Sequence, residues 1–112
     1  ELRRTFRRHI FRIQAESICI PSPVFDTLQR NSELADWIIR AAYHAAVAEV
    51  LAARPPSAGY DPGKRMMVVT LGRLGMHEFD VGSDADLVFV LPDDDRAELQ
   101  FWTRVAERII DI

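Results

Sequence analysis

The chain has 112 residues, of which 48% are hydrophobic and 28% are charged, and its formal net charge is −3. This length allows one domain at most, and the composition is that of a globular chain rather than a disordered one. No apolar run reaches the roughly 20 residues that a membrane helix needs, and the charged N-terminus is unlike a signal peptide. A single cysteine, Cys19, cannot form an internal disulfide. A reducing compartment, the cytoplasm, is therefore expected.

Charge is distributed unevenly along the chain. Residues 3–12 hold five arginines, whereas residues 78–98 hold eight acidic residues and one basic residue. The arginines indicate a solvated helix face, or alternatively a docking surface for an acidic partner or an adjoining domain. The acidic half is where a cation site is expected, and the negative net charge argues against nucleic-acid binding.

The first half of the chain is predicted to be helical. Apolar residues spaced by three or four predict one helix over residues 2–18. A second helical pattern extends to about Ala53, with Ser22 as a plausible N-cap and Pro23 as the first helical residue. The poor helix formers Asn31-Ser32 leave open a division of this long helix into two pieces.

The chain is expected to divide into three parts. Residues 1–54 form an N-terminal helical part, and residues 55–65 form a linker in which prolines and glycines prevent regular structure. Residues 66–112 form the start of an α/β part that is incomplete. The predicted fold class is therefore α+β, with helices flanking a sheet and a helical segment in front of it.

Two strands and a final helix are predicted in the third part. Met66–Leu71 is a short β-rich apolar run that stops at a glycine, and Asp84–Leu91 is a second strand ended by a proline. Residues 72–83 are predicted to form a turn, a helical turn and a loop. A last helix begins at Asp93–Asp95, whose acidic side chains suit the helix dipole, and five residues face inward: Leu99, Trp102, Val105, Ala106 and Ile109.

Two aspartates at the start of the second strand are the first candidates for chemistry. Residues two apart on a strand point to the same face, about 6.5–7 Å from each other, so Asp84 and Asp86 would form a seat for a divalent cation. Oxygen ligands from few protein groups suit Mg²⁺, which completes its shell with water and phosphates. The structural alternative is that Asp84 caps a turn and Asp86 pairs with an arginine.

A glycine turn after the first strand is the second element. Gly72 and Gly75, followed by a short helical turn, bring backbone N–H groups together where an anion can bind. A phosphate cradle on one strand and a metal seat on its neighbour would face one triphosphate. This combination favours nucleotidyl transfer.

These elements together resemble a known superfamily. The order strand, Gly-x-x-Gly, short helix and Ser-Asp-x-Asp-Leu is similar to the polymerase-β-like nucleotidyltransferases. The fuller strings Leu71–Gly75 and Gly82–Phe89 resemble the glutamine synthetase adenylyltransferase (glutamate–ammonia-ligase adenylyltransferase) family in particular. The flanking helices are similar as well, so the resemblance covers nearly the whole chain.

The resemblance implies a nucleotidyltransferase-like sheet and a role for each matching residue. The two aspartates would be the catalytic residues that hold Mg²⁺, and the two glycines would form the turn against the triphosphate of ATP. The arginine would meet a phosphate, and the serine would support the loop or touch a phosphate oxygen. The residues concerned are Gly72, Arg73, Gly75, Ser83, Asp84 and Asp86.

The family's activity sets further expectations. Its bacterial, cytoplasmic members attach AMP to a tyrosine of glutamine synthetase or remove it by phosphorolysis, which controls nitrogen assimilation, and a PII-type signal protein is a further expected partner. The superfamily uses a third carboxylate on a later strand that this chain does not reach, so a fragment with an incomplete active site is expected. The alternatives are a non-catalytic nucleotide-sensing or protein-docking module and a nucleic-acid-elongating transferase, against which the acidic surroundings argue.

Overall fold

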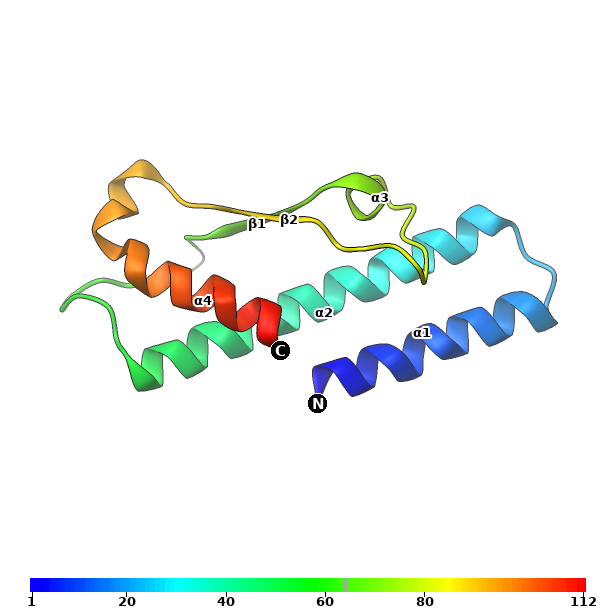
Figure 1. The fold of residues 1–112 in the computed structure, drawn as a ribbon, viewed down its shortest axis with the longest axis horizontal. Helices are drawn as coiled ribbons and strands as arrows, with labels where there is room; N and C mark the ends of the chain where they lie inside the picture. The colour runs from blue at the N-terminus through cyan, green and yellow to red at the C-terminus, as the bar shows by residue number, and fades with distance from the viewer. Residues whose placement is uncertain (64) are drawn as a thin grey trace.

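One long helix organises the molecule. The computed structural model describes residues 1–63 and 65–112, so residue 64 of the expected linker lies outside the described residues. The elements in chain order are α1 (Leu2–Cys19), α2 (Val24–Ala53), β1 (Met67–Thr70), α3 (Gly72–Gly75), β2 (Leu87–Val90), the 3-10 helix η1 (Asp93–Glu98) and α4 (Leu99–Asp111). Figure 1 shows α2 along the length of the molecule, with α1 beside it and the β1–β2 hairpin above it.

Helix α2 is continuous, so the division that the sequence left open at Asn31-Ser32 does not occur. Both side chains are fully buried, and the Ser32 hydroxyl donates a hydrogen bond to the carbonyl of Leu28 at 2.9 Å. Tertiary contacts therefore override the low helix propensity of the two residues. The predicted cap is also wrong by one residue, because Pro23 itself takes the N-cap position and Ser22 lies before it.

The sheet is a two-stranded antiparallel hairpin whose register pairs Met67 with Val90 and Thr70 with Leu87. Strand β2 begins at Leu87, so the expectation of a strand from Asp84 is wrong by three residues. Pairing continues one step further, since the amide of Leu71 donates to the carbonyl of Asp86 at 2.9 Å. The carboxylate pair therefore lies in the segment that leads into β2.

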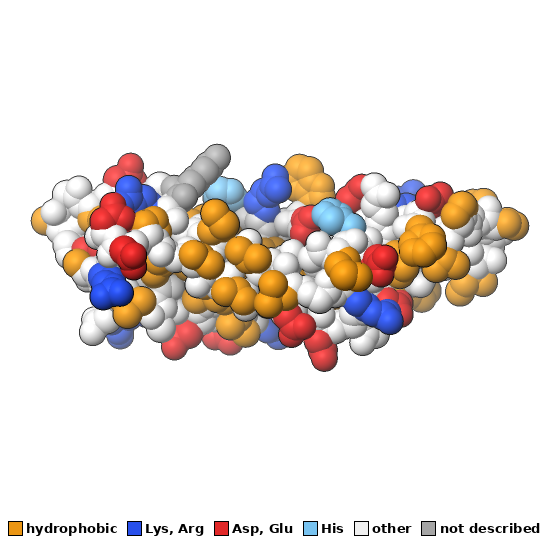
Figure 2. Space-filling model, turned by 90° about the horizontal axis from the view of Figure 1, so that it is seen from above, with side chains coloured by type: hydrophobic (Ala, Val, Ile, Leu, Met, Phe, Trp, Pro, Cys, Tyr) orange, Lys and Arg blue, Asp and Glu red, His pale blue; other side chains and the backbone are white. Residues whose placement is uncertain are grey.

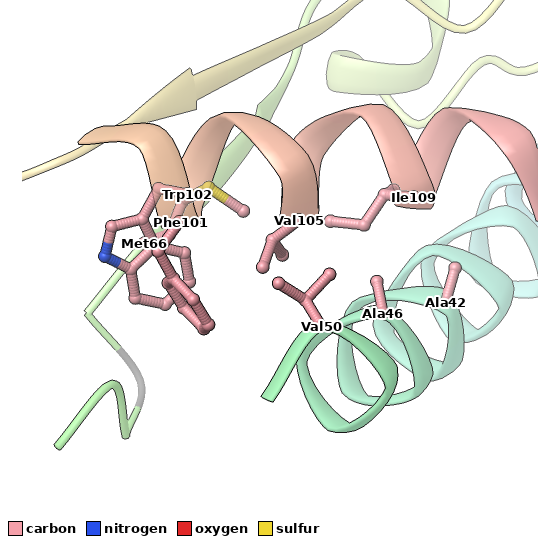
Figure 3. Packing of buried hydrophobic residues seen from close by; sticks show 8 residues of the cluster. All are labelled: Ala42, Ala46, Val50, Met66, Phe101, Trp102, Val105 and Ile109. Carbon is pink, nitrogen blue, oxygen red and sulfur yellow. The ribbon is translucent and has the colours of Figure 1, made fainter. Parts of the chain in front are cut away.

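The main core joins α2, α4 and the start of the hairpin. The small residues Ala42 and Ala46 on α2 let α4 approach closely, and a stripe of larger side chains fills the contact (Figure 3). The eight buried members of this core are Ala42, Ala46, Val50, Met66, Phe101, Trp102, Val105 and Ile109. Leu99, predicted to face inward, is exposed because it lies to one side of this stripe, and Cys19 is exposed as well.

The architecture agrees with the α+β prediction at the level of its elements: a helix-rich chain with one small antiparallel sheet. The two ends of the described chain meet, since the Arg3 guanidinium donates to the Asp111 carbonyl at 2.9 Å. Among residues 1–63 and 65–112, no helix is long and apolar enough to cross a membrane.

An ion pair between an exposed arginine and a buried aspartate connects the segment before β1 to η1. Asp95 is buried, and the Arg65 guanidinium binds its carboxylate with two hydrogen bonds, of 2.8 Å from Nε and 2.7 Å from Nη2. These bonds hold the pKa of Asp95 below its usual value. The acidic run at the start of η1, which the sequence analysis related to the helix dipole, therefore also supplies a tertiary contact.

We expect Asp95 to make the stability of the chain depend on pH. A carboxyl group whose pKa is lower in the folded state stabilises the fold above the unfolded pKa of about 3.9, and this contribution disappears as the pH falls through the folded pKa. The urea midpoint of the wild type should therefore exceed that of Asp95→Asn at pH 6 and converge with it near pH 2. The control Asp93→Asn changes a fully exposed carboxylate and should show no such convergence. A constant difference across the pH range would contradict the assignment.

Candidate functional site

Five of the six predicted site residues line one cleft of about 530 Å³ between α3 and the segment before β2. Figure 1 shows these two segments at the same end of the hairpin. The lining residues are Gly72, Arg73, Asp80, Gly82, Ser83, Asp84 and Asp86. Gly75 is the predicted residue that the cleft lining does not include. The structure therefore brings together two segments whose residues the sequence pattern placed in one site.

Asp84 and Asp86 are both exposed at the edge of this cleft. Within residues 1–63 and 65–112, neither carboxylate takes part in an ion pair, so the alternative in which Asp86 is paired with an arginine is not found there. Two adjacent carboxylates without a counter-charge favour a cation, and an all-oxygen donor set suits Mg²⁺. The fit is partial, because the described residues hold no group of three or more potential metal ligands.

The two glycines of the turn have different roles. Gly72 has a φ of +58°, and a Cβ atom there would lie 3.5 Å from Oδ2 of Asp86, so the turn passes close to the carboxylate. Gly75 instead faces β1, where a Cβ atom would lie only 2.5 Å from the carbonyl oxygen of Thr70. The structure therefore places Gly72 in the cleft and Gly75 in the packing that supports it.

Arg73 and a tight turn also line the cleft. Nη1 of Arg73 lies 3.7 Å from Oδ2 of Asp80, a long contact between exposed side chains. The turn is closed by two hydrogen bonds, from the Ser83 amide to the Asp80 carbonyl at 3.0 Å and from the Asp80 amide to the Ser83 hydroxyl at 3.3 Å. Ser83 thus supports the loop, and the Arg73 guanidinium can turn toward an anion in the cleft.

The cleft is anchored to α2 by a polar pair that sequence reasoning assigned to a possible helix break. Asn31 Nδ2 donates to the Phe79 carbonyl at 3.1 Å, and the Phe79 amide donates to the Ser32 hydroxyl at 3.0 Å. The side chains of Leu74 and Phe79 are buried against Ala35 of the same helix. The sequence held one signal for this contact: two polar residues lie inside a helix that is otherwise apolar on its inner face.

Substitution at Gly75 should disturb this support, whereas the same change at Gly82 should not. A side chain at residue 75 must displace the β1 backbone, which we expect to lower the free energy of unfolding by about 1–3 kcal/mol. Gly82→Ala is the matched control, because nothing lies within 4 Å of its Cβ position. Urea unfolding of Gly75→Ala and Gly82→Ala tests this, and equal midpoints would contradict the packing role of Gly75.

The cleft combines a carboxylate pair, a glycine turn and an arginine that makes only a long contact with Asp80. These groups define a candidate site for a phosphate ester together with a divalent cation. The family model described as glutamate-ammonia ligase adenylyltransferase matches residues 1–112. The chain belongs to this family.

Several curated proteins that are similar to this chain share one name with each other. The chain is 37% identical over 89 residues to a bifunctional glutamine synthetase adenylyltransferase/adenylyl-removing enzyme of Rhizobium meliloti (strain 1021), a match that covers 70% of this chain and 9% of that protein. The enzyme of the same name from Streptomyces coelicolor is 36% identical over 80% of this chain and 8% of its own length. The chain thus spans less than a tenth of the curated relatives it matches. No solved structure matches it.

Proposed function

We propose that this chain contributes the nucleotide- and metal-binding part of an adenylyltransferase site that acts on glutamine synthetase. The single observation that carries the proposal is the cleft in which Asp84 and Asp86 lie beside Gly72 and Arg73. The names of its relatives support glutamine synthetase as the protein substrate. The proposed setting is a nucleotidyltransferase-like sheet in a larger bacterial, cytoplasmic protein, regulated by a PII-type signal protein.

Five residues of the cleft have a defined task in this proposal. Asp84 and Asp86 hold Mg²⁺, and when bound the ion neutralises charge on the phosphate oxygens of ATP and orients them for in-line attack. Gly72 leaves the space that lets phosphate approach the carboxylates, because any larger residue would place its Cβ atom near Asp86. Arg73 meets a phosphate oxygen, and Ser83 keeps the loop closed.

The reaction is a substitution at the α-phosphorus of ATP. The hydroxyl oxygen of a tyrosine in glutamine synthetase forms the new bond to phosphorus, the bond to the bridging oxygen breaks, and pyrophosphate leaves while the phenolic proton passes to solvent. In the removing direction, an oxygen of inorganic phosphate attacks the phosphorus of the AMP–tyrosine ester, the bond from that phosphorus to the tyrosine oxygen breaks, the tyrosine oxygen takes up a proton, and ADP is released. The carboxylates and the glycine turn have the same tasks in whichever of the two reactions this chain serves.

The alternative of a non-catalytic nucleotide-sensing or protein-docking module is not favoured, because the relatives carry the names of enzymes. The test uses the whole protein that carries this chain, incubated with glutamine synthetase, Mg²⁺ and ATP labelled at the α-phosphate. Label should appear on glutamine synthetase, and ATP labelled at the γ-phosphate should transfer none. For the removing direction, adenylylated glutamine synthetase and phosphate should yield ADP. Absence of both reactions would refute the proposal.

A further inference from the structure

The cleft residues lie on a long connection between β1 and β2, residues 71–86, that few buried groups hold in place. Within this range, only Leu74 and Phe79 have buried side chains. Both pack against Ala35 of α2. Figure 2 shows acidic and basic side chains together at the surface in the region of α3 and the loop that follows it, so the outer side of this connection is polar. Its place on the molecule is therefore set from its inner side, by α2.

Two polar side chains of α2 fix the direction of this contact, which apolar packing leaves undefined because the hydrophobic effect has no direction. The Phe79 carbonyl accepts a hydrogen bond of 3.1 Å from Asn31 Nδ2, and the Phe79 amide donates one of 3.0 Å to the Ser32 hydroxyl. The proton of that hydroxyl goes to the Leu28 carbonyl, so a lone pair is left to face Phe79. Asn31 and Ser32 are each 0% exposed, so water does not compete for these bonds. Both backbone polar groups of one loop residue are thus bound to one helix.

Phe79 is the point at which the two halves of the cleft are held together. On one side of it, the Glu78 amide donates to the Arg73 carbonyl at 2.8 Å, which fastens the loop to the glycine turn. On the other side, Asp80 and Ser83 close the tight turn that leads into the carboxylate pair. A displacement of the Phe79 backbone is therefore passed to both halves.

We propose that Asn31 and Ser32 are positioning residues of the adenylyltransferase site. They hold the Phe79 backbone where the glycine turn and the two carboxylates keep the spacing that one metal-bound triphosphate requires. Neither side chain lines the cleft, so both act through Phe79. This inference rests on the proposed function, since it assigns the support of the same site.

The loss of one of these hydrogen bonds acts on the cleft. Without the Ser32 hydroxyl, the Phe79 amide has no partner on α2, and a buried N–H group without a partner is unfavourable. The connection can relieve this by moving toward water, because most of its residues are already exposed. A misplacement of about 1 Å can slow a reaction by about 100-fold, so a small movement is enough to affect catalysis.

The experiment compares Ser32→Ala with Ser17→Ala in the whole protein that carries this chain. The Ser17 hydroxyl donates to the Gln14 carbonyl of its own helix at 2.8 Å, so the control loses the same kind of bond on α1. AMP transfer to glutamine synthetase is measured with ATP varied and then with Mg²⁺ varied. We expect Ser32→Ala to lower kcat/KM for ATP by about 10- to 100-fold, with a higher KM for ATP and a higher half-saturating Mg²⁺ concentration. Ser17→Ala should keep the wild-type values.

The kinetic constants separate positioning from general stability. A variant that is only less stable contains fewer active molecules, which lowers the maximal rate and leaves KM for ATP and the Mg²⁺ dependence unchanged. That result for Ser32→Ala, or constants equal to those of an active wild type, would overturn the inference and leave the proposed function intact.

Amide hydrogen exchange tests the anchor without catalysis. Exchange in residues 71–86 should be faster in Ser32→Ala than in the wild type and in Ser17→Ala, with exchange in α4 unchanged, because the lost contact is local. If the wild type transfers no AMP, the proposed function fails, and faster exchange confined to residues 71–86 still supports anchoring by Ser32. Equal exchange in all three proteins would overturn the inference.

Discussion

Replacing Asp84 or Asp86 by asparagine is expected to lower AMP transfer to glutamine synthetase by at least about 100-fold, the loss that removal of one preorganised charge-stabilising group typically produces. Asparagine keeps the size of the side chain and removes the negative charge that a cation requires. Both residues are exposed, so the fold should remain intact. Transfer of α-labelled AMP and Mg²⁺-dependent ATP binding measure the effect in the whole protein.

The matched control for this prediction is Asp93→Asn. It makes the same chemical change at an exposed carboxylate on η1 that does not line the cleft. Its activity and its Mg²⁺-dependent affinity for ATP should equal those of the wild type. If Asp84→Asn and Asp86→Asn retain Mg²⁺-dependent affinity for ATP, the metal assignment is wrong, whatever the family of the chain.

The second large effect is expected at Trp102, where substitution by alanine should lower the free energy of unfolding by about 3–5 kcal/mol. The side chain is 1% exposed, packs edge-to-face with Phe101, and donates from Nε1 to the Tyr60 hydroxyl at 2.9 Å. Its removal leaves a cavity between α4 and the segment that leads into β1. Urea unfolding of the 112-residue chain measures the difference.

Trp37 provides the same substitution at an exposed position. It lies on α2, is 69% exposed, and has the Arg40 guanidinium 5.7 Å from its ring centroid as a contact. Trp37→Ala should therefore change the free energy of unfolding by less than about 1 kcal/mol. A comparable loss in both variants would mean that α4 does not pack as described.

The local elements of the fold were predictable because each has a strong short-range signal. Apolar spacing located α1 and α2, and the glycine after a β-rich run located the end of β1. The boundaries that differ are those at which short-range signals compete with packing. Strand β2 begins at Leu87 because the preceding residues take part in the cleft, and Asn31-Ser32 remains helical because both side chains find partners outside the helix.

The candidate site was predictable in its residue types and only partly in its geometry. Two carboxylates spaced by one residue and a glycine turn indicated a cation next to a phosphate, and the cleft lining contains the two carboxylates and Gly72 of the turn. The packing role of Gly75 and the anchoring of the loop by Asn31 were not predictable, since each depends on a backbone group far away in the sequence: the Thr70 carbonyl in one case and the Phe79 carbonyl in the other.

The amino-acid sequence by itself determined the order of helices and strands, because this order follows from local periodicity. It also determined the family of the chain and the charged residues of the cleft, because these follow from the sequence motif. Only the tertiary structure decided which distant group pairs with a buried one, as Arg65 does with Asp95, and which face of the hairpin stays exposed beside Asp86. Burial and hydrogen bonding depend on segments distant in sequence, and a one-dimensional pattern does not specify which of them meet.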